Sequence, residues 1–295
     1  PEIYKNHNFK DQIRAQWVRV ELDVNWKFFC DNFNESYHTR FVHPQVPSVI
    51  DQDHFTSRYE MFPKGHARII QMGRPSLRDR LAEGEDHPFK MILEDWGVDV
   101  GKYTNYETMS EQGWLDLKAA KRKLWKEKGY FHYENLSDEE LTESPFQFVF
   151  PNIAMGVQAD GCILLNWFPH PTDPEKCFFD LWDMGYPIGG SAKGIGKTGR
   201  DTNQEFTSTS AGIGKKEKAN DQEFLSRTKV NPVKLQEVEL DFRDYDGGKG
   251  VEDLWDHVVY QDWQLTDGLR RGVRSKGYQE PYLASQETRV RYFHE

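Results

Sequence analysis

Residues 25–44 read NWKFFCDNFNESYHTRFVHP, and their apolar positions recur with the period of a helix. The positions i, i+3, i+4, i+7 and i+11 of one helical face are Trp26, Phe29, Cys30, Phe33 and Tyr37. We therefore predict a helix that begins near Trp26 and carries this apolar stripe as far as Tyr37. Pro44 prevents any regular continuation.

Two histidines, His38 and His43, stand near the end of this predicted helix. On a helical wheel His38 shares a polar face with Asp31, Asn34 and Glu35, away from the apolar stripe. Such a face could simply be solvated. On spacing alone, a histidine pair of this kind is more often structural than metal-binding.

Runs of alternating or continuous apolar residues predict strands at 17–22, 55–62, 66–71, 146–150, 153–157, 162–168, 177–183 and 233–242. The short connections between most of them favour antiparallel hairpins. A helix is predicted at 107–129, and its basic face, which includes Lys118, Lys121 and Arg122, reads as solvated. Residues 185–220 contain eight glycines and almost no large apolar residue, which predicts a loop or lid inserted into the sheet domain.

Composition bounds the function classes. The chain has 295 residues, 37% of them hydrophobic, and a net charge of -10, which argues against a general nucleic-acid binder. No apolar run is long enough for a membrane span or a signal peptide, so the cytoplasm is the expected compartment. The three cysteines, Cys30, Cys162 and Cys177, form no paired motif, which argues against a disulfide framework, a structural zinc site or a cysteine-ligated cluster. Because the chain starts at Pro1 without methionine, it is expected to be a fragment.

A second predicted helix, at 258–272, carries a carboxylate on an apolar face. Asp262 shares that face with Leu265, Leu269 and Val273. A carboxylate in a buried stripe is costly unless it is paired or bound to a cation. Together with two histidines it would form the facial triad of a non-haem iron(II) site.

Other interpretations of the acidic residues remain open on sequence grounds. Asp262 could instead form a buried salt bridge or lie at a helix N-terminus. Asp180 and Asp183, on a predicted strand, could supply the carboxylate in its place. Asp256 and His257 could be outer groups around a metal site or merely surface residues.

Two motifs resemble a known family. The stretch from Asn25 to His38, followed by His43-Pro44, resembles the iron-binding signature of Rieske non-haem iron oxygenases, the aromatic-ring-hydroxylating dioxygenase alpha subunits. Residues 261–275, 285–287 and 292–294 look like the family's C-terminal helix, whose aspartate is the third iron ligand. Residues 151–153 and 167–169 also match its central strands. The resemblance covers nearly the whole chain except 185–220.

The resemblance implies an α+β fold, a helix-grip (START/Bet v 1-like) domain in which a curved, mostly antiparallel sheet wraps around a long C-terminal helix. It implies one catalytic domain over 1–295. The implied iron ligands are His38, His43 and Asp262. Glu35 would link His38 to a Rieske-cluster histidine of the neighbouring subunit, although many members have aspartate there. Asn32 would approach the metal from the same helix.

The implied cofactors are a mononuclear Fe(II) in this chain and a [2Fe-2S] cluster in an N-terminal Rieske domain. The Cys-x-His and Cys-x-x-His pairs that hold such a cluster are missing here, so the chain resembles the catalytic domain alone. The implied partners are O2, a small apolar or aromatic substrate, and a ferredoxin or NAD(P)H-dependent reductase. The implied assembly is a homotrimer or α3β3, with neither nucleic acid nor a membrane as partner.

The expected reaction is hydroxylation of an apolar, aromatic substrate, as a dioxygenase or monooxygenase. Oxidative N- or O-demethylation within the same family is the first alternative. A domain of the same fold that binds a hydrophobic ligand without metal is the second.

Overall fold

The structure, a computed structural model, describes residues 2–43, 46–78, 87–187, 205–206, 233–234, 239–241, 257–279 and 281–295. Its α-helices are α1 (Lys27–Phe33), α2 (Thr39–Val42), α3 (Pro88–Asp95), α4 (Tyr106–Leu124), α7 (His257–Val273) and α8 (Thr288–His294). Its strands are β1 (Ile13–Leu22), β2 (Arg58–Phe62), β3 (His66–Met72), β4 (Glu143–Val149), β5 (Ile153–Gln158), β6 (Gly161–Pro169), β7 (Cys177–Gly185), β8 (Glu205–Phe206), β9 (Val233–Lys234) and β10 (Glu239–Asp241). Short 3-10 helices are Glu2–Tyr4, Phe9–Asp11, Val46–Ser48, Val100–Lys102, Phe131–Asn135 and Ser285–Glu287. Most of the predicted 185–220 insertion lies outside the described residues.

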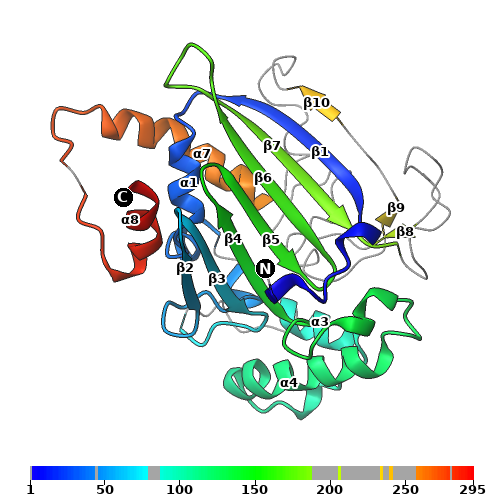
Figure 1. The fold of residues 1–295 in the computed structure, drawn as a ribbon. Coiled ribbons are helices and arrows are strands. Elements are labelled where there is room, and N and C mark those ends of the chain that lie inside the picture. Colours follow the sequence, from blue (N-terminus) through cyan, green and yellow to red (C-terminus); the bar gives the residue numbers. More distant parts are fainter. Residues whose placement is uncertain are drawn as a thin grey trace.

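Eight strands form one sheet in the order β10-β1-β7-β6-β5-β4-β3-β2 (Figure 1). Every pairing in it is antiparallel except that of β1 with β10. The β2–β3 hairpin turns through Pro63, Lys64 and Gly65, as predicted, and the last two residues have positive φ angles of 67° and 78°. The α+β class with a mostly antiparallel sheet is therefore confirmed. The long helix α7 passes behind the strands in Figure 1.

The pairing register arranges one face of the sheet in rows, because directly opposed antiparallel residues point to the same side. The first row is Ala67, Phe148, Ala154 and Leu165. Two residues along each strand, the second row is Ile69, Phe146, Gly156 and Ile163. The third row pairs Gln71 with Ser144, and Gln158 donates a hydrogen bond to the Ser144 hydroxyl (3.1 Å). The face thus changes from apolar to polar along the strands.

The first row packs against α1 and α8. Phe29 and Cys30 of α1 and Phe293 of α8 belong to the same buried cluster, and Phe29 stacks on Trp167 with ring centroids 5.9 Å apart. The predicted stripe does anchor a helix, but that helix ends at Phe33 and leaves Tyr37 exposed. It ends there because the buried Asn34 amide donates to the Cys30 carbonyl (2.9 Å), a local hydrogen bond that competes with helix continuation.

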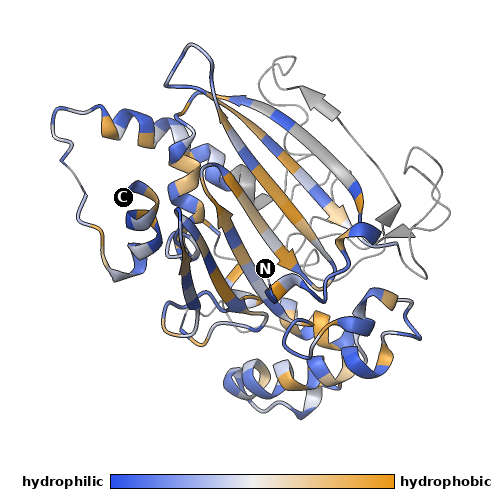
Figure 2. Cartoon of the chain, viewed as in Figure 1, coloured by the Kyte–Doolittle hydropathy of each residue, from blue (hydrophilic) through white to orange (hydrophobic). Residues whose placement is uncertain are grey.

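Helices α3 and α4 lie together beyond the opposite ends of the strands, below the sheet in Figure 1. They enclose a second core that includes Phe89, Leu93 and Leu117. The outer side of α4 is mostly hydrophilic (Figure 2), but Lys121 is buried and only 7% exposed. The expectation of a wholly solvated basic face was therefore wrong at this residue.

The predicted helix at 258–272 is present as α7, but its predicted buried stripe was wrong. Asp262 is 6% exposed, whereas Leu265, Leu269 and Val273 are 42–45% exposed. The reason is that α7 is covered mainly near its start, where it contacts α2 and where Trp263 packs against the first core. The later turns have one open side.

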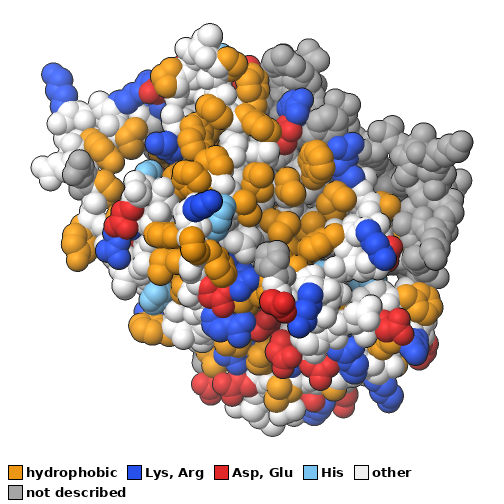
Figure 3. Space-filling model, viewed as in Figure 1, with side chains coloured by type: hydrophobic (Ala, Val, Ile, Leu, Met, Phe, Trp, Pro, Cys, Tyr) orange, Lys and Arg blue, Asp and Glu red, His pale blue; other side chains and the backbone are white. Residues whose placement is uncertain are grey.

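Hydrophobic side chains also gather over the central strands on the face seen in Figure 3. The register places Met155, Leu164 and Trp182 in one row there, on the side opposite to the rows described above. None of the helices in the described part of the chain is long and apolar enough to cross a membrane.

Candidate metal centre

The chain between α1 and α2 positions the first histidine. His38 directly precedes α2, and its backbone N–H donates to Glu35 Oε2 (3.1 Å). The other carboxylate oxygen, Oε1, accepts a hydrogen bond from Nδ1 of the same histidine. Glu35 therefore holds both the backbone and the ring of His38 in place.

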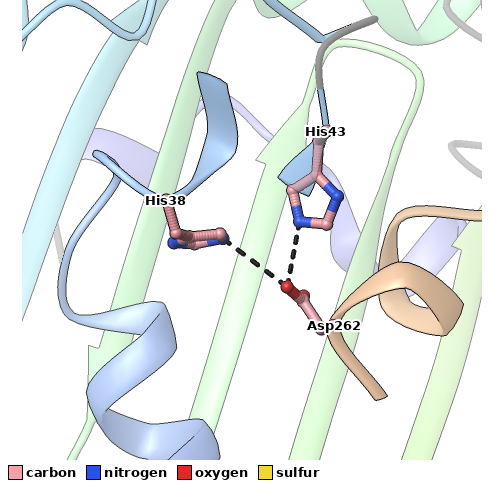
Figure 4. A group of neighbouring side chains, drawn as sticks. All are labelled: His38, His43 and Asp262. Carbon is pink, nitrogen blue, oxygen red and sulfur yellow. Dashed lines mark ion pairs between the residues drawn. The ribbon is translucent and has the colours of Figure 1, made fainter. Parts of the chain in front are cut away.

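His38, His43 and Asp262 converge from α2 and α7 (Figure 4). Asp262 Oδ1 lies 3.0 Å from His43 Nε2 and 3.7 Å from His38 Nε2. The ligand atoms of the three residues all lie within 4.8 Å of one another. The fold thus brings the three predicted ligands together.

Each histidine has a hydrogen-bond partner at its other ring nitrogen. Nδ1 of His38 donates to Glu35, and Nδ1 of His43 donates to Gln261 Oε1 (2.8 Å). A proton held on Nδ1 leaves the Nε2 lone pair of each ring directed towards Asp262. This is the orientation that a histidine ligand requires.

The donor set fits a divalent ion. His43 Nε2 and Asp262 Oδ1 are fully buried but make no hydrogen bond, although buried polar atoms are normally satisfied. Two ligands that bind one ion at about 2.1 Å and at right angles are roughly 3 Å apart, close to the separation of these two atoms. A cation between the three side chains would satisfy both atoms.

The charges around His38 favour a cationic neighbour or a proton. Burial alone lowers the pKa of His38, but the hydrogen bond and charge of Glu35, with the charge of Asp262, outweigh burial and raise this pKa above its ordinary value. The same two carboxylates would stabilise a metal ion at the histidine.

A cavity of about 230 Å³ adjoins the three side chains. Asn32 lines it, as do Glu35, His38, His43 and Asp262, so every predicted site residue borders one space. Its floor includes the second row of the sheet, and it continues to the third row and to Lys121 of α4. Apolar wall thus lies next to the candidate ligands.

The other carboxylates considered from the sequence lie elsewhere or are not described. Both oxygens of Asp180 accept hydrogen bonds from Arg19 (2.7 Å each), so this carboxylate is already paired. Within the described ranges, the group of His38, His43 and Asp262 has metal-ligand spacing, and Asp183 is not part of it. Asp256 and the side chain of His257 lie outside the described residues.

Sequence reasoning missed three residues around the site. Gln261 orients His43, and only its position beside Asp262 could have suggested this. Arg289 of α8 is almost fully buried, and burial lowers its pKa to about 10 although the charges of Tyr59 and Glu35 act in the opposite direction. Lys121 lines the far end of the cavity. Neither cation carries a local sequence signal.

Comparisons with known proteins place this chain in a family. Residues 9–186 match the family model of the ring hydroxylating alpha subunit, catalytic domain. The match covers more than half of the chain, so the chain belongs to this family, and the resemblance seen in the sequence is confirmed. The matched region contains His38 and His43, whereas Asp262 lies beyond it. No curated protein matches the chain significantly in sequence.

Several solved structures are similar. A quaternary ammonium Rieske monooxygenase, studied for carnitine oxidation and inter-subunit electron transfer, is 13% identical over 99% of this chain and 52% of its own, with a TM-score of 0.48. Naphthalene 1,2-dioxygenase from Rhodococcus sp. bound to indole is 16% identical over 94% of this chain and 53% of its own (TM-score 0.39). Dicamba monooxygenase bound to 3,6-dichlorosalicylic acid is 10% identical over 96% and 57% (TM-score 0.37). The chain spans about half the length of these proteins.

Proposed function

We propose that this chain is the catalytic domain of a Rieske-type oxygenase, which binds Fe(II) through His38, His43 and Asp262 and hydroxylates an apolar, aromatic substrate. The observation that carries the proposal is the pair of buried atoms without hydrogen bonds, His43 Nε2 and Asp262 Oδ1, between two oriented histidines. Fe(II) in such a site supplies oxygen activation, because two histidines and one carboxylate leave positions open.

Glu35 is the residue we assign to electron entry. It is hydrogen-bonded to His38 and lines the cavity. Tyr37, two residues further along the chain, is exposed at the surface. The exposed Phe41 lies on the adjacent α2. A [2Fe-2S] cluster carried by a Rieske domain of a neighbouring subunit would deliver the electrons on this side. Asn32 lines the cavity on the preceding helix and would contact the substrate or the metal's surroundings.

The cavity supports an apolar substrate. Ile69, Phe146 and Ile163 form an apolar row beside the candidate ligands, and the space they border suits a small ring. The chain's own contribution to the reaction is to bind and orient that ring and to exclude bulk water from it. Monooxygenation, dioxygenation and oxidative demethylation all use this arrangement, so product analysis decides among them.

We also propose the partners of the enzyme and its compartment. O2 is the co-substrate, and a ferredoxin or NAD(P)H-dependent reductase supplies electrons to the cluster. A homotrimer or α3β3 assembly would bring a neighbouring cluster to Glu35. We propose the cytoplasm as the compartment.

Metal content tests the proposal directly. The purified protein is reconstituted anaerobically with Fe(II), desalted, and its iron per chain is compared with that of Asp262→Asn and of Asp267→Asn. Asp267 is the matched control, because it is on the same helix but exposed and paired with Arg270 and Arg271. We expect one iron per chain in the wild type and in Asp267→Asn, and almost none in Asp262→Asn.

Two outcomes would overturn the proposal. The first is wild-type protein that folds but retains no iron, which would favour a metal-free ligand-binding domain. The second is an Asp262→Asn protein that retains the full iron content, which would remove the carboxylate from the ligand set.

A further inference from the structure

The cavity becomes polar one row away from its apolar floor. Gln71 and Ser144 are buried, and Gln158 is hydrogen-bonded to Ser144. All three line the same cavity as the candidate ligands. Successive rows on one face of a strand are roughly 7 Å apart, because each residue advances the strand by about 3.3 Å. The polar row therefore lies about one aromatic ring beyond the apolar row.

A buried cation stands at this polar end. The Lys121 ammonium donates to the Leu141 carbonyl (2.9 Å) and lies 3.8 Å from Asp160 Oδ2. An ammonium carries three donors, and the second contact is longer than a hydrogen bond. The ammonium also lies 5.6 Å and 5.5 Å from the ring centroids of Trp96 and Tyr133. Lys121, Leu141 and Asp160 all line the cavity, so an ammonium with three donors could also donate to a group bound there.

The neighbouring carboxylate does not depend on Lys121 alone. Asp160 Oδ1 accepts a hydrogen bond from the Tyr133 hydroxyl (2.5 Å) and lies 3.5 Å from His132 Nε2. Burial would raise the pKa of Asp160, but Lys121, His132 and Tyr133 together hold it below its ordinary value. Residues of the 3-10 helix Phe131–Asn135, as well as Lys121 of α4, therefore stabilise the charge of Asp160.

One further carboxylate faces the cavity and would oppose an anion. Glu143 of β4 lines the cavity, and its Oε1 lies 3.8 Å from Nη2 of Arg58 in β2. Burial raises the pKa of Glu143, and Arg58 offsets its charge. Its repulsion is therefore weaker than that of a free carboxylate.

We propose, resting on the proposed function, that the substrate is an aromatic carboxylate whose carboxylate group binds Lys121 and the Ser144–Gln158–Gln71 row. Its ring lies on Ile69, Phe146 and Ile163, with the carbon to be oxidised directed towards His38 and His43. A hydrocarbon of the same shape leaves the Lys121 donor facing an apolar group. Because hydrogen bonds to charged groups contribute about 1.5–3 kcal/mol, the carboxylate should bind roughly 10- to 100-fold more tightly.

The test compares ligands of one shape and different charge. Calorimetric titrations of the metal-free and the Fe(II)-loaded protein use 4-methylbenzoate, 4-methylbenzamide, 4-methylbenzylammonium and p-xylene. We expect 4-methylbenzoate to bind at least about tenfold more tightly than the other three, with and without iron. Lys121→Met should remove this preference, and Lys123→Met, an exposed lysine on the same helix, should keep it.

Each outcome decides the matter. Equal binding of the four ligands by the wild type overturns the proposal even if Lys121→Met fails to fold. A preference for 4-methylbenzoate that requires iron and survives Lys121→Met places the carboxylate at the metal and also overturns it. Iron content, measured on the same samples, reports on the proposed function separately, so the two failures are distinguishable.

Discussion

The two ends of the cavity contain similar residues with different partners. At one end, Asp262 meets His38 and His43, and its ion pairs in the described part of the chain are with these two histidines. At the other end, Asp160 meets His132 and also a lysine of the chain itself, Lys121. A buried aspartate is thus paired with a lysine of the chain at the α4 end, whereas at the α7 end its described partners are two histidines whose ring nitrogens could instead bind the proposed metal ion.

Replacing Asp160, the aspartate that is paired with Lys121, should have the largest effect on stability. Asp160→Asn leaves the Lys121 ammonium buried without its counter-charge, which typically costs about 3–5 kcal/mol. We expect the free energy of unfolding, from urea titration of the metal-free protein, to fall by that amount. A loss below about 1 kcal/mol would mean that the pair contributes little and would remove the contrast between the two ends.

The α7 end should respond in the opposite way. Without metal, Asp262→Asn should change the free energy of unfolding by less than about 1 kcal/mol, because it removes a carboxylate that lacks a hydrogen bond at Oδ1. Fe(II) at 100 times its dissociation constant should stabilise the wild type by about 2.7 kcal/mol and the variant not at all. Unfolding curves recorded anaerobically with and without Fe(II) measure both effects. Equal stabilisation of the two proteins would place the metal elsewhere.

Low pH should destabilise the fold at the α4 end, through His87 at the start of α3. His87, whose Nδ1 accepts the Phe89 N–H at the start of α3, is buried, and burial together with Lys90 lowers its pKa from 6.5 to about 4. A depressed pKa contributes stability that is complete above the unfolded value of 6.5 and is lost as the pH falls towards 4. Between pH 7 and 5 the free energy of unfolding should fall by about 2 kcal/mol, which urea titrations at a series of pH values measure.

The control for this pH dependence is His87→Asn, which keeps a side-chain acceptor at the helix start but does not titrate. Its free energy of unfolding should fall less steeply over the same pH range. Parallel curves for the two proteins would show that another group causes the acid sensitivity.

The smallest effect is expected from the residue behind His38. Glu35→Gln keeps an oxygen that can accept from His38 Nδ1 but removes the charge, so Fe(II) affinity should fall by about tenfold, or 1.4 kcal/mol. Competition with a chelator of known affinity measures it. Glu35→Asp should retain more affinity than Glu35→Gln, and the reverse order would argue that the charge of Glu35 has no part in metal binding.

Local patterns predicted the elements better than they predicted the pairing of charges. The stripe of Trp26, Phe29 and Phe33 is enough to predict α1, and the alternation in β4–β7 is enough to predict the hairpins, because both depend on neighbours in sequence. Ligand chemistry suggested a triad of Asp262 with the two histidines but left Asp180 and Asp183 open, and only the family resemblance favoured Asp262 over them. His43 and Gln261, which are hydrogen-bonded, are 218 residues apart, and no local periodicity spans that distance.

The residues that were misjudged depend on contacts with distant parts of the chain. A helical wheel cannot show that Lys121 turns towards Asp160 in the β5–β6 turn, so its burial was missed. It likewise cannot show that α7 is covered only near its start, so Leu265 and Leu269 were wrongly expected to be buried. In both cases the helix was predicted and its partner was not.

The most direct test of the central claim is a crystal structure of the Fe(II)-loaded protein, prepared anaerobically and measured at the iron absorption edge. The account predicts one anomalous peak, bounded by Nε2 of His38, Nε2 of His43 and the carboxylate of Asp262. A peak bound by other side chains, or fully loaded protein with no peak between these three, would contradict it.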